Sequence, residues 1–512
     1  MKRGLIAPLL LILAGLGLFF LFVRKESRPA PTGSIVVYCA ANLKKPVEAI
    51  AKQYGEETGV EVQLQYGGTG TLLSQLQVAR KGDLFIAADD GTVADARKAE
   101  LINEVIPLVT QRPVVAVKRG NPENIKSLAD LSREGIKFSL ANPDAASISK
   151  IVRKLLGPQW ESFAAKATVM KPTVTEVAAD IQIGAVDAGI VWDATVAQFD
   201  GLELVEVAEF KEHREHASAA VLTACTQPQE ALRFARYMAA PDRGGKAFQQ
   251  SGFQSAGGDK WAVRPSLILY SGGVNRLAIE KVLQQFADRE DVDLTTIFNG
   301  CGILCSAMKT MEDATDPKFP DVYYACDVCF VPPVAEHFPE AVMLTETEIV
   351  IAVPKGNPGN LKTLSDLARP GLRVGLCNAE QSTLGYMTSA MLRSSGLHES
   401  VRRNVKVEVP TADFLINQMR VGSLDAIVVY KVNVAPQAEH FDMVALPADK
   451  PRAVQPFAVR HDSPNRQLGG RLLTFLRNHK EAFESAGFVW RGDEKAVPSD
   501  RLEIPDWLKP AP

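Results

Sequence analysis

The sequence contains no block of like charge and none of the short motifs that mark the common enzyme classes. Its 57 Lys and Arg residues face 60 Asp and Glu residues, giving a net charge of −3, so no basic stripe suggests a nucleic-acid partner. There is no G-x-S-x-G, no P-loop and no H-E-x-x-H, and the seven His residues form no catalytic pattern. We therefore expect a protein that is not an enzyme, holds no metal or cofactor and does not bind nucleic acid.

One long apolar run stands at the N-terminus. It extends from Leu5 to Val23 between basic residues, and 19 helical residues at about 1.5 Å each cross a bilayer. No A-x-A cleavage pattern and no lipid-accepting Cys follow it. We interpret residues 1–33 as an uncleaved signal anchor and linker, with a cleaved signal peptide as the alternative. The rest of the chain is then expected to be periplasmic or otherwise extracytoplasmic, anchored in the cytoplasmic membrane.

The remainder of the chain is one pattern written twice. Residues 120–131, GNPENIKSLADL, and 356–367, GNPGNLKTLSDL, are identical at eight of twelve positions. Weaker echoes keep the same order on both sides, and their spacing drifts only from 232 to 238 residues. A unit of that length is a whole domain rather than a solenoid repeat. We predict two domains at 34–262 and 263–492, here called the first and second copies, and a tail at 493–512.

Each copy alternates short apolar strands with amphipathic helices. SIVVYCAA precedes a helix for which Asn42 is a plausible N-cap, and DLFIAAD is a continuous apolar run suited to a buried parallel strand. Midway through each copy the Gly-Asn-Pro turn begins a second set of strands and helices before the chain returns. This order predicts an α/β fold in which two lobes are joined by a hinge and enclose a cleft.

Three places in the first copy set small or polar residues just before a helix. They are Ala40-Ala41-Asn42, Gly68-Thr69-Gly70 and Asp144-Ala145-Ala146-Ser147. Free N–H groups at a helix start, with hydroxyl donors beside them, suit an oxyanion. The alternative is structural: Asn42 and Ser147 are helix caps and the glycines form turns.

The order YCAANL, YGGTGTL, DLFIAAD, LANPD, GIVW and SGF resembles the periplasmic molybdate-binding proteins. The resemblance covers 34–256 and, more weakly, 266–490. It implies a type 2 periplasmic-binding fold, a tetrahedral oxyanion of the molybdate or tungstate type as ligand, and an ABC permease as partner. The family's binding positions fall on Asn42, Thr69 with Gly70, Ser147 with Ile148, Val174 and Trp192. Asn42 stands where the family has a serine, and Trp192 where it has a tyrosine.

The second copy departs further from that family. Val274 replaces the first donor, and Cys301, with Gly302 beside it, stands at the position of Thr69. Tyr430 matches the family's tyrosine. A lost hydrogen bond to a charged ligand costs about 1.5–3 kcal/mol. This cleft is therefore expected to bind a different ligand or none.

Five of the seven cysteines lie in the second copy, at 301, 305, 326, 329 and 377. Disulfides are permitted outside the cytoplasm, and Cys301 with Cys326 is the pair we favour. A metal or thiol site around Cys326-Asp-Val-Cys329 and a set of buried free thiols are the alternatives. The function we predict is an extracytoplasmic solute-binding protein for an ABC importer. The alternative is a membrane-tethered ligand sensor or a cysteine-dependent interaction module.

Overall fold

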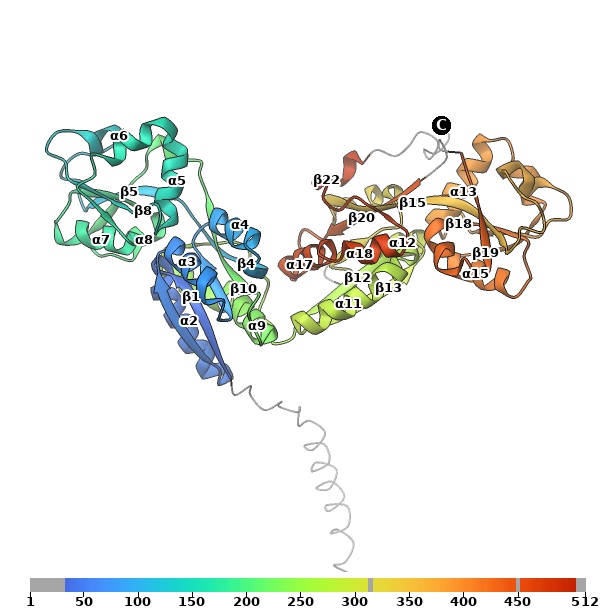
Figure 1. Cartoon of the computed structure of the whole chain (residues 1–512), viewed down its shortest axis with the longest axis horizontal. Coiled ribbons are helices and arrows are strands. Elements are labelled where there is room, and N and C mark those ends of the chain that lie inside the picture. The colour runs from blue at the N-terminus through green and yellow to red at the C-terminus, as the bar shows by residue number, and fades with distance from the viewer. Residues whose placement is uncertain (1–32, 312–315, 448–451, 503–512) are drawn as a thin grey trace, which may run out of the picture. The chain divides into compact units, whose positions relative to one another are not determined.

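The computed structural model describes residues 33–311, 316–447 and 452–502 and forms two compact units that separate near Ala256 (Figure 1). Each unit has two α/β lobes, so the predicted α/β class and tandem organisation are confirmed. No helix within these described ranges is both long and apolar enough to cross a bilayer. The predicted signal anchor, with its apolar run at 5–23, lies outside them.

The first unit holds two sheets. The chain begins and ends in a terminal lobe, whose sheet has the order β11-β4-β10-β3-β1-β2, and between them builds an inserted lobe with the order β7-β6-β8-β5-β9. The strands are β1 Ser34–Ala40, β2 Glu61–Gly67, β3 Leu84–Ala87, β4 Ile102–Gln111, β5 Pro113–Lys118, β6 Phe138–Ala141, β7 Val169–Lys171, β8 Ala188–Trp192, β9 Leu202–Val205, β10 Glu215–Leu222 and β11 Gln254–Ser255.

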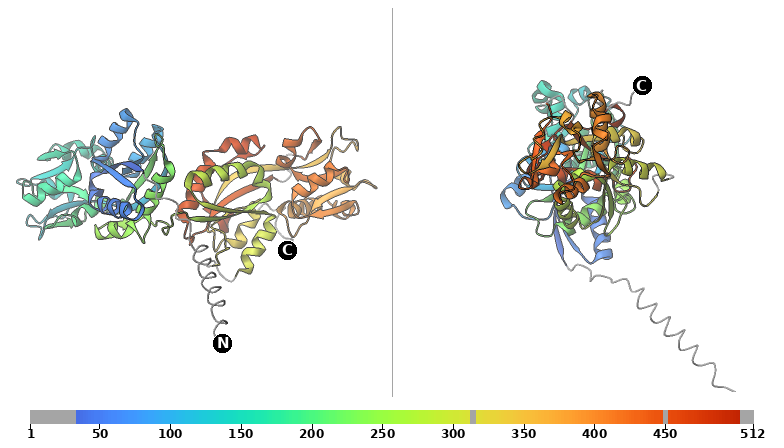
Figure 2. Two further views of the ribbon diagram at one scale, coloured as in Figure 1. Left: turned by 90° about the horizontal axis from the view of Figure 1, so that it is seen from below. Right: turned by 90° about the vertical axis from the view of Figure 1, so that its right-hand side faces the viewer.

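Helices flank both sheets of this unit (Figure 2). They are α2 Lys44–Thr58, α3 Thr69–Ala79, α4 Asp90–Lys98, α5 Ser147–Leu156, α6 Trp160–Ala164, α7 Val174–Ile183, α8 Asp193–Ala197, α9 Pro228–Ala239 and α10 Gly244–Gln250. The parallel strand β3 is buried at every position, whereas the edge strand β2 alternates between exposed and half-buried residues. The continuous apolar run and the alternating run therefore fall where their patterns predict, at the centre and at the edge of a sheet.

The second unit repeats this plan with one long sheet. Its order is β13-β12-β14-β20-β15-β18-β16-β17, and β19, β21 and β22 also pair with β15. The strands are β12 Ser266–Gly272, β13 Asp293–Asn299, β14 Val322–Tyr324, β15 Glu340–Pro354, β16 Val374–Cys377, β17 Val405–Val409, β18 Ala426–Tyr430, β19 Phe441–Ala445, β20 Arg452–Val459, β21 Val489–Trp490 and β22 Val497–Pro498. The helices are α11 Arg276–Glu290, α12 Cys301–Thr310, α13 Thr383–Ser394, α14 His398–Arg402, α15 Ala412–Arg420, α16 Lys431–Val434, α17 Arg466–Arg477 and α18 Lys480–Ser485.

The two units differ where the chain crosses between lobes. In the second unit β15 runs unbroken through both lobes, pairing first with β20 and then with β18. In the first unit the same path is split at Arg112, between β4 and β5. Part of the segment predicted as a tail forms β22, which pairs with the start of β15; residues 503–512 lie outside the described part.

An ion pair sits at this crossing in each unit, with its charges reversed. Arg112 Nε lies 3.7 Å from Asp193 Oδ2, and the Arg112 N–H also donates to Asp193 Oδ1 at 3.2 Å. At the matching positions of the second unit, Lys431 Nζ lies 3.3 Å from Glu348 Oε2. The position that is basic in one copy is therefore acidic in the other.

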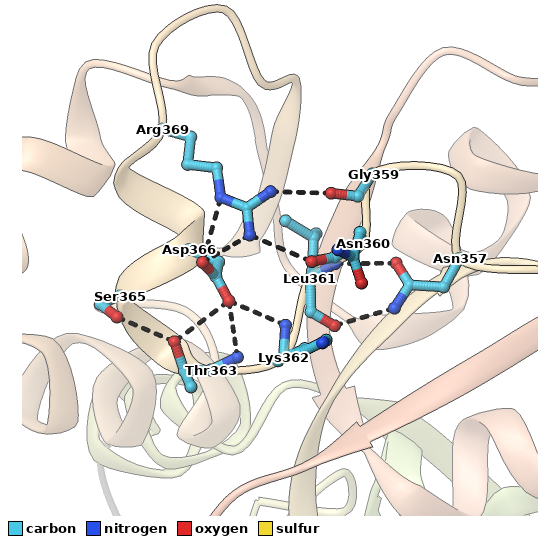
Figure 3. A network of polar contacts seen from close by, with 9 residues as sticks. All are labelled: Asn357, Gly359, Asn360, Leu361, Lys362, Thr363, Ser365, Asp366 and Arg369. Atoms are coloured by element: carbon cyan, nitrogen blue, oxygen red, sulfur yellow. Dashed lines mark hydrogen bonds and ion pairs between the residues drawn. The ribbon is translucent and has the colours of Figure 1, made fainter.

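The most strongly repeated stretch, 120–131 and 356–367, is a structural motif. Asn357 adopts a left-handed φ of 45°, and its side-chain amide donates to Leu361 O at 2.8 Å while its oxygen accepts from Leu361 N–H (Figure 3). The Asp366 carboxylate then accepts from the N–H groups of Lys362 and Thr363 and from Arg369. Asn121, Ile125 and Asp130 repeat this arrangement in the first copy. None of these residues lines either cleft described below.

Removing the hydrogen bonds that the Asp366 carboxylate accepts should destabilise the second unit without changing its cleft. Hydrogen bonds from Lys362 and Arg369 hold the pKa of Asp366 below its ordinary value. Its stabilisation is therefore fully present above about pH 3.9 and is lost as the pH falls through the lower folded-state pKa. We expect Asp366→Ala to cost about 1 kcal/mol in the unfolding transition of the second unit, measured in urea at pH 7.

The equivalent substitution in the first copy provides the matched control. Asp130→Ala should move the other transition instead, because Asp130 caps the same turn of the first unit. An Asp366→Ala variant that unfolds like the unaltered protein would contradict the structural role of the motif.

Candidate functional site

A hollow of about 240 Å³ lies between the two lobes of the first unit, and we call it the first cleft. It is built where strands β1, β2 and β8 end and helices α3, α5 and α7 begin. Its lining residues are Ala40, Ala41, Asn42, Gly67, Gly68, Thr69, Ala88, Ala146, Ser147, Ile148, Thr173, Val174 and Trp192. All three sequence segments predicted to face one cleft contribute to it.

Helix starts at this cleft lack side-chain caps. Gly68 precedes α3, Ala146 precedes α5 and Ala40 precedes the short 3-10 turn that leads into α2, and none of them supplies a capping hydrogen bond. By contrast, Thr173 caps α7 through the Glu176 N–H. In α3 the Gly70 and Thr71 N–H groups donate to Ala145 O instead. First-turn N–H groups without a partner in the protein suit a ligand, and the helix dipoles favour an anion there. The prediction that Asn42 and Ser147 are helix caps is wrong, because Leu43 and Ala146 occupy the N-cap positions of α2 and α5.

The Asn42 side chain is oriented by a residue far away in the sequence. Its amide nitrogen donates to Gln111 Oε1 at 2.9 Å, and Gln111 Nε2 donates to Ala88 O at 2.7 Å. Asn42 and Gln111 are buried, at 2% and 1% exposure. Gln111 is thus a positioning residue that the sequence reasoning missed, because no local pattern links it to Asn42.

Thr69, Ser147 and Trp192 come from three different elements and are all nearly buried. Thr69 is the first residue of α3, and Trp192 is the last residue of β8. Burial raises the pKa of the nearby Asp89 carboxyl, while hydrogen bonding from Thr92 opposes that rise. Ser147 and Val174, the first residues of α5 and α7, also line the cleft.

Gly70 lies beside the cleft rather than in it. Its N–H donates to Ala145 O, 2.9 Å away in the inserted lobe, and a Cβ at Gly70 would lie 2.6 Å from Asp144 O. The neighbouring Gly68 approaches the inserted lobe just as closely, since its Cβ would lie 2.4 Å from Ala145 O. The glycines of this turn therefore permit the two lobes to close on each other, and a direct ligand contact by Gly70 stays a prediction.

The matching hollow of the second unit, about 310 Å³, is the second cleft. Its lining residues are Gly273, Val274, Asn299, Gly300, Cys326, Ser382, Leu384, Pro410, Thr411, Ala412, Asp413, Tyr430 and Asn433. Tyr430 lies in it as predicted, whereas Cys301 and Gly302 do not line it. Cys301 is fully buried, and a Cβ at Gly302 would lie 2.3 Å from Glu380 O of the opposite lobe.

The Cys301 and Cys326 sulfurs lie 2.7 Å apart, and both residues are free thiols in this structure. Burial raises the pKa of Cys301 and that of Cys305. Among the described residues no three His, Cys, Asp or Glu side chains gather as metal ligands. The Cys301–Cys326 disulfide stays a prediction, for which the neighbouring sulfurs are the geometric basis.

This pairing predicts a specific cross-linked peptide. Protein exported to an oxidising compartment, alkylated without reduction and digested, should yield a Cys301–Cys326 linked pair by mass spectrometry. Cys377, at the end of β16, should be alkylated as a free thiol once the protein is unfolded. Recovery of Cys301 and Cys326 as separately alkylated peptides would show that they remain free thiols.

Residues 35–254 and 267–489 both match the bacterial extracellular solute-binding proteins, and the chain belongs to this family as two tandem copies. The molybdate-binding protein ModA of Mycobacterium bovis is 27% identical over 230 residues, covering 43% of this chain and 84% of that protein. The sulfate-binding protein of Synechococcus elongatus is 27% identical over 153 residues, covering 27% and 39% of the two chains.

Solved structures give similar coverage. The periplasmic molybdate-binding protein of Azotobacter vinelandii is 17% identical with a TM-score of 0.37, and the match covers 43% of this chain and 98% of that one. The family match and the curated relatives confirm the resemblance to molybdate-binding proteins drawn from the sequence. They place the chain among extracytoplasmic solute-binding proteins, a class with a binding rather than an enzymatic role.

Proposed function

We propose that the first cleft captures a tetrahedral oxyanion of the molybdate or tungstate type and delivers it to an ABC permease. The observation that carries this proposal is the convergence of three helix starts without side-chain caps on one hollow lined by uncharged residues. Backbone N–H groups at Ser147 and Val174, the Thr69 hydroxyl, the Asn42 amide and the Trp192 indole are the donors we assign to the ligand.

The chemistry of this set favours an anion that carries no proton. Every group assigned to the ligand donates a hydrogen bond, so a fully deprotonated dianion can accept from all of them. A protonated anion would place its own O–H donor opposite another donor and lose a hydrogen bond. Binding at both lobes would shift the protein towards its closed arrangement. The names of the curated relatives, a molybdate-binding and a sulfate-binding protein, agree with a ligand of this shape. The predicted membrane anchor would hold the protein near the permease.

The test is a melting-temperature screen of the full chain with molybdate, tungstate, sulfate, phosphate and ferric citrate. Molybdate or tungstate should raise the melting temperature of one unit, since ligand that binds only the folded state stabilises it. Thr69→Val should lower the affinity for that anion about 10- to 100-fold, because one charge-assisted hydrogen bond is lost. Cys301→Ser, at the matching position of the second copy, is the control and should leave binding unchanged. The absence of a shift with all five anions would refute the proposal.

A further inference from the structure

The second cleft differs from the first in the polarity of the groups that face it. Asp413 lines it at the second position of α15, where the first copy has Thr175. An Asp at a helix start itself occupies the place that favours an anion, and it repels a second one. Val274, at the position of Asn42, offers no side-chain donor. The helix starts at this cleft also lack side-chain caps, so the second cleft differs from the first in these two side chains rather than in its helix ends.

Two further residues of this cleft present atoms that nothing in the protein satisfies. Tyr430 and Asn433 are 3% and 4% exposed and both line the cleft. The Tyr430 hydroxyl and Asn433 Oδ1 have no hydrogen-bond partner within the described residues. Leaving a buried polar atom unpaired costs about 1–3 kcal/mol. Such atoms are expected where a ligand completes the hydrogen bonding.

The charges around Asp413 leave its carboxylate available. Arg276 is the cation that faces it, and its guanidinium stacks 4.7 Å from the centre of the Phe298 ring. No ion pair to Asp413 is formed within the part of the chain that the structure describes. The Asp413 side chain itself is exposed to solvent. A carboxylate held in this way favours a cation that can reach it from the cleft.

We propose that the second cleft binds a small organic cation, a protonated amine whose N–H and O–H groups donate to Asp413, Tyr430 and Asn433. The tandem copies then bind ligands of opposite charge. This assignment goes beyond the function proposed for the first cleft and does not depend on it. The hollow is narrow, so the amine must be small.

Calorimetry on the full chain with ethanolamine, putrescine, glycerol and molybdate as probes tests the assignment. At least one of the two amines should bind with one site per chain, while uncharged glycerol should bind at least tenfold more weakly. Asp413→Asn, which keeps the size and removes the charge, should weaken the amine about tenfold or more. Tyr430→Phe removes only an unpartnered hydroxyl, so it should fold normally and weaken the amine by about three- to tenfold.

The first cleft supplies the control that separates the two sites. Thr69→Val should leave amine binding unchanged, because Thr69 lines only the first cleft. Failure of both amines to bind would overturn the proposal. It would also be overturned if molybdate bound at two sites per chain and Tyr430→Phe removed one of them, because the second cleft would then be an oxyanion site. Either result would leave the test of the first cleft standing.

Discussion

Gly68→Ala should weaken oxyanion binding by the first unit about 100-fold or more. Gly68 has φ −64° and ψ 143°, which alanine adopts without strain, so the terminal lobe should fold as before. The new Cβ would lie 2.4 Å from Ala145 O and 2.8 Å from Pro172 O, both on the inserted lobe. Overpacking of backbone against backbone costs about 3 kcal/mol, and it falls only on the closed arrangement, so affinity drops by the corresponding factor.

Isothermal titration of the full chain with molybdate, with urea unfolding in the absence of ligand, checks both halves of this expectation. Gly300→Ala is the matched control, since its Cβ would lie 2.2 Å from Gln381 O in the second unit and Gly300 has nearly the same backbone angles. It should leave molybdate binding intact. If Gly68→Ala bound molybdate as tightly as the unaltered protein, closure at this turn would not be part of the mechanism.

Glu290→Gln should destabilise the second unit by about 3 kcal/mol. Glu290, at the end of α11, forms two hydrogen bonds with the Arg471 guanidinium of α17, at 2.7 and 3.1 Å, and is 1% exposed. Removing one charge leaves a buried guanidinium without its main partner, which typically costs about 3–5 kcal/mol. The nearby Asp259 carboxylate also attracts Arg471, which places the expected loss at the lower end.

Urea unfolding that resolves the two units is the appropriate measurement, because only the transition of the second unit should move. The exposed pair of Lys44 and Glu48 provides the comparison, and Glu48→Gln should change stability by less than about 1 kcal/mol. Combining Glu290→Leu with Arg471→Met should recover much of the loss, since an apolar pair carries no unpaired charge. A single substitution with no effect would show that the buried charge remains satisfied elsewhere.

The sequence predicts the architecture well because the information for it is local and present twice. The apolar run at 84–87 and the alternating run at 61–67 specify buried and edge strands by pattern alone. The repeated Gly-Asn-Pro segment is so similar in the two copies because left-handed residues such as Asn121 and Asn357 and the Asp caps constrain nearly every position. The strongest repeat signal therefore reports structure, while the clefts lie where the copies diverge.

Contacts between distant segments account for what the sequence could not predict. The local sequence predicts Asn42 to be a helix cap, but its side-chain amide donates to Gln111, 69 residues away. The sequence does not show that the Gly70 N–H donates to Ala145 of the other lobe. Asp413 carried a detectable signal, since aligning the two copies places it opposite Thr175, yet its meaning depends on Tyr430 and Asn433 sharing the same hollow.

The reversed ion pairs at the crossings bear on how such a chain folds without error. Two similar halves synthesised in succession can exchange parts, and misassembly of this kind is a characteristic failure of repeat-containing proteins. If the terminal lobe of one copy assembled with the inserted lobe of the other, Arg112 would face Lys431, or Glu348 would face Asp193. Like charges would then meet at the crossing between lobes. This repulsion disfavours assembly of a terminal lobe with the inserted lobe of the other copy.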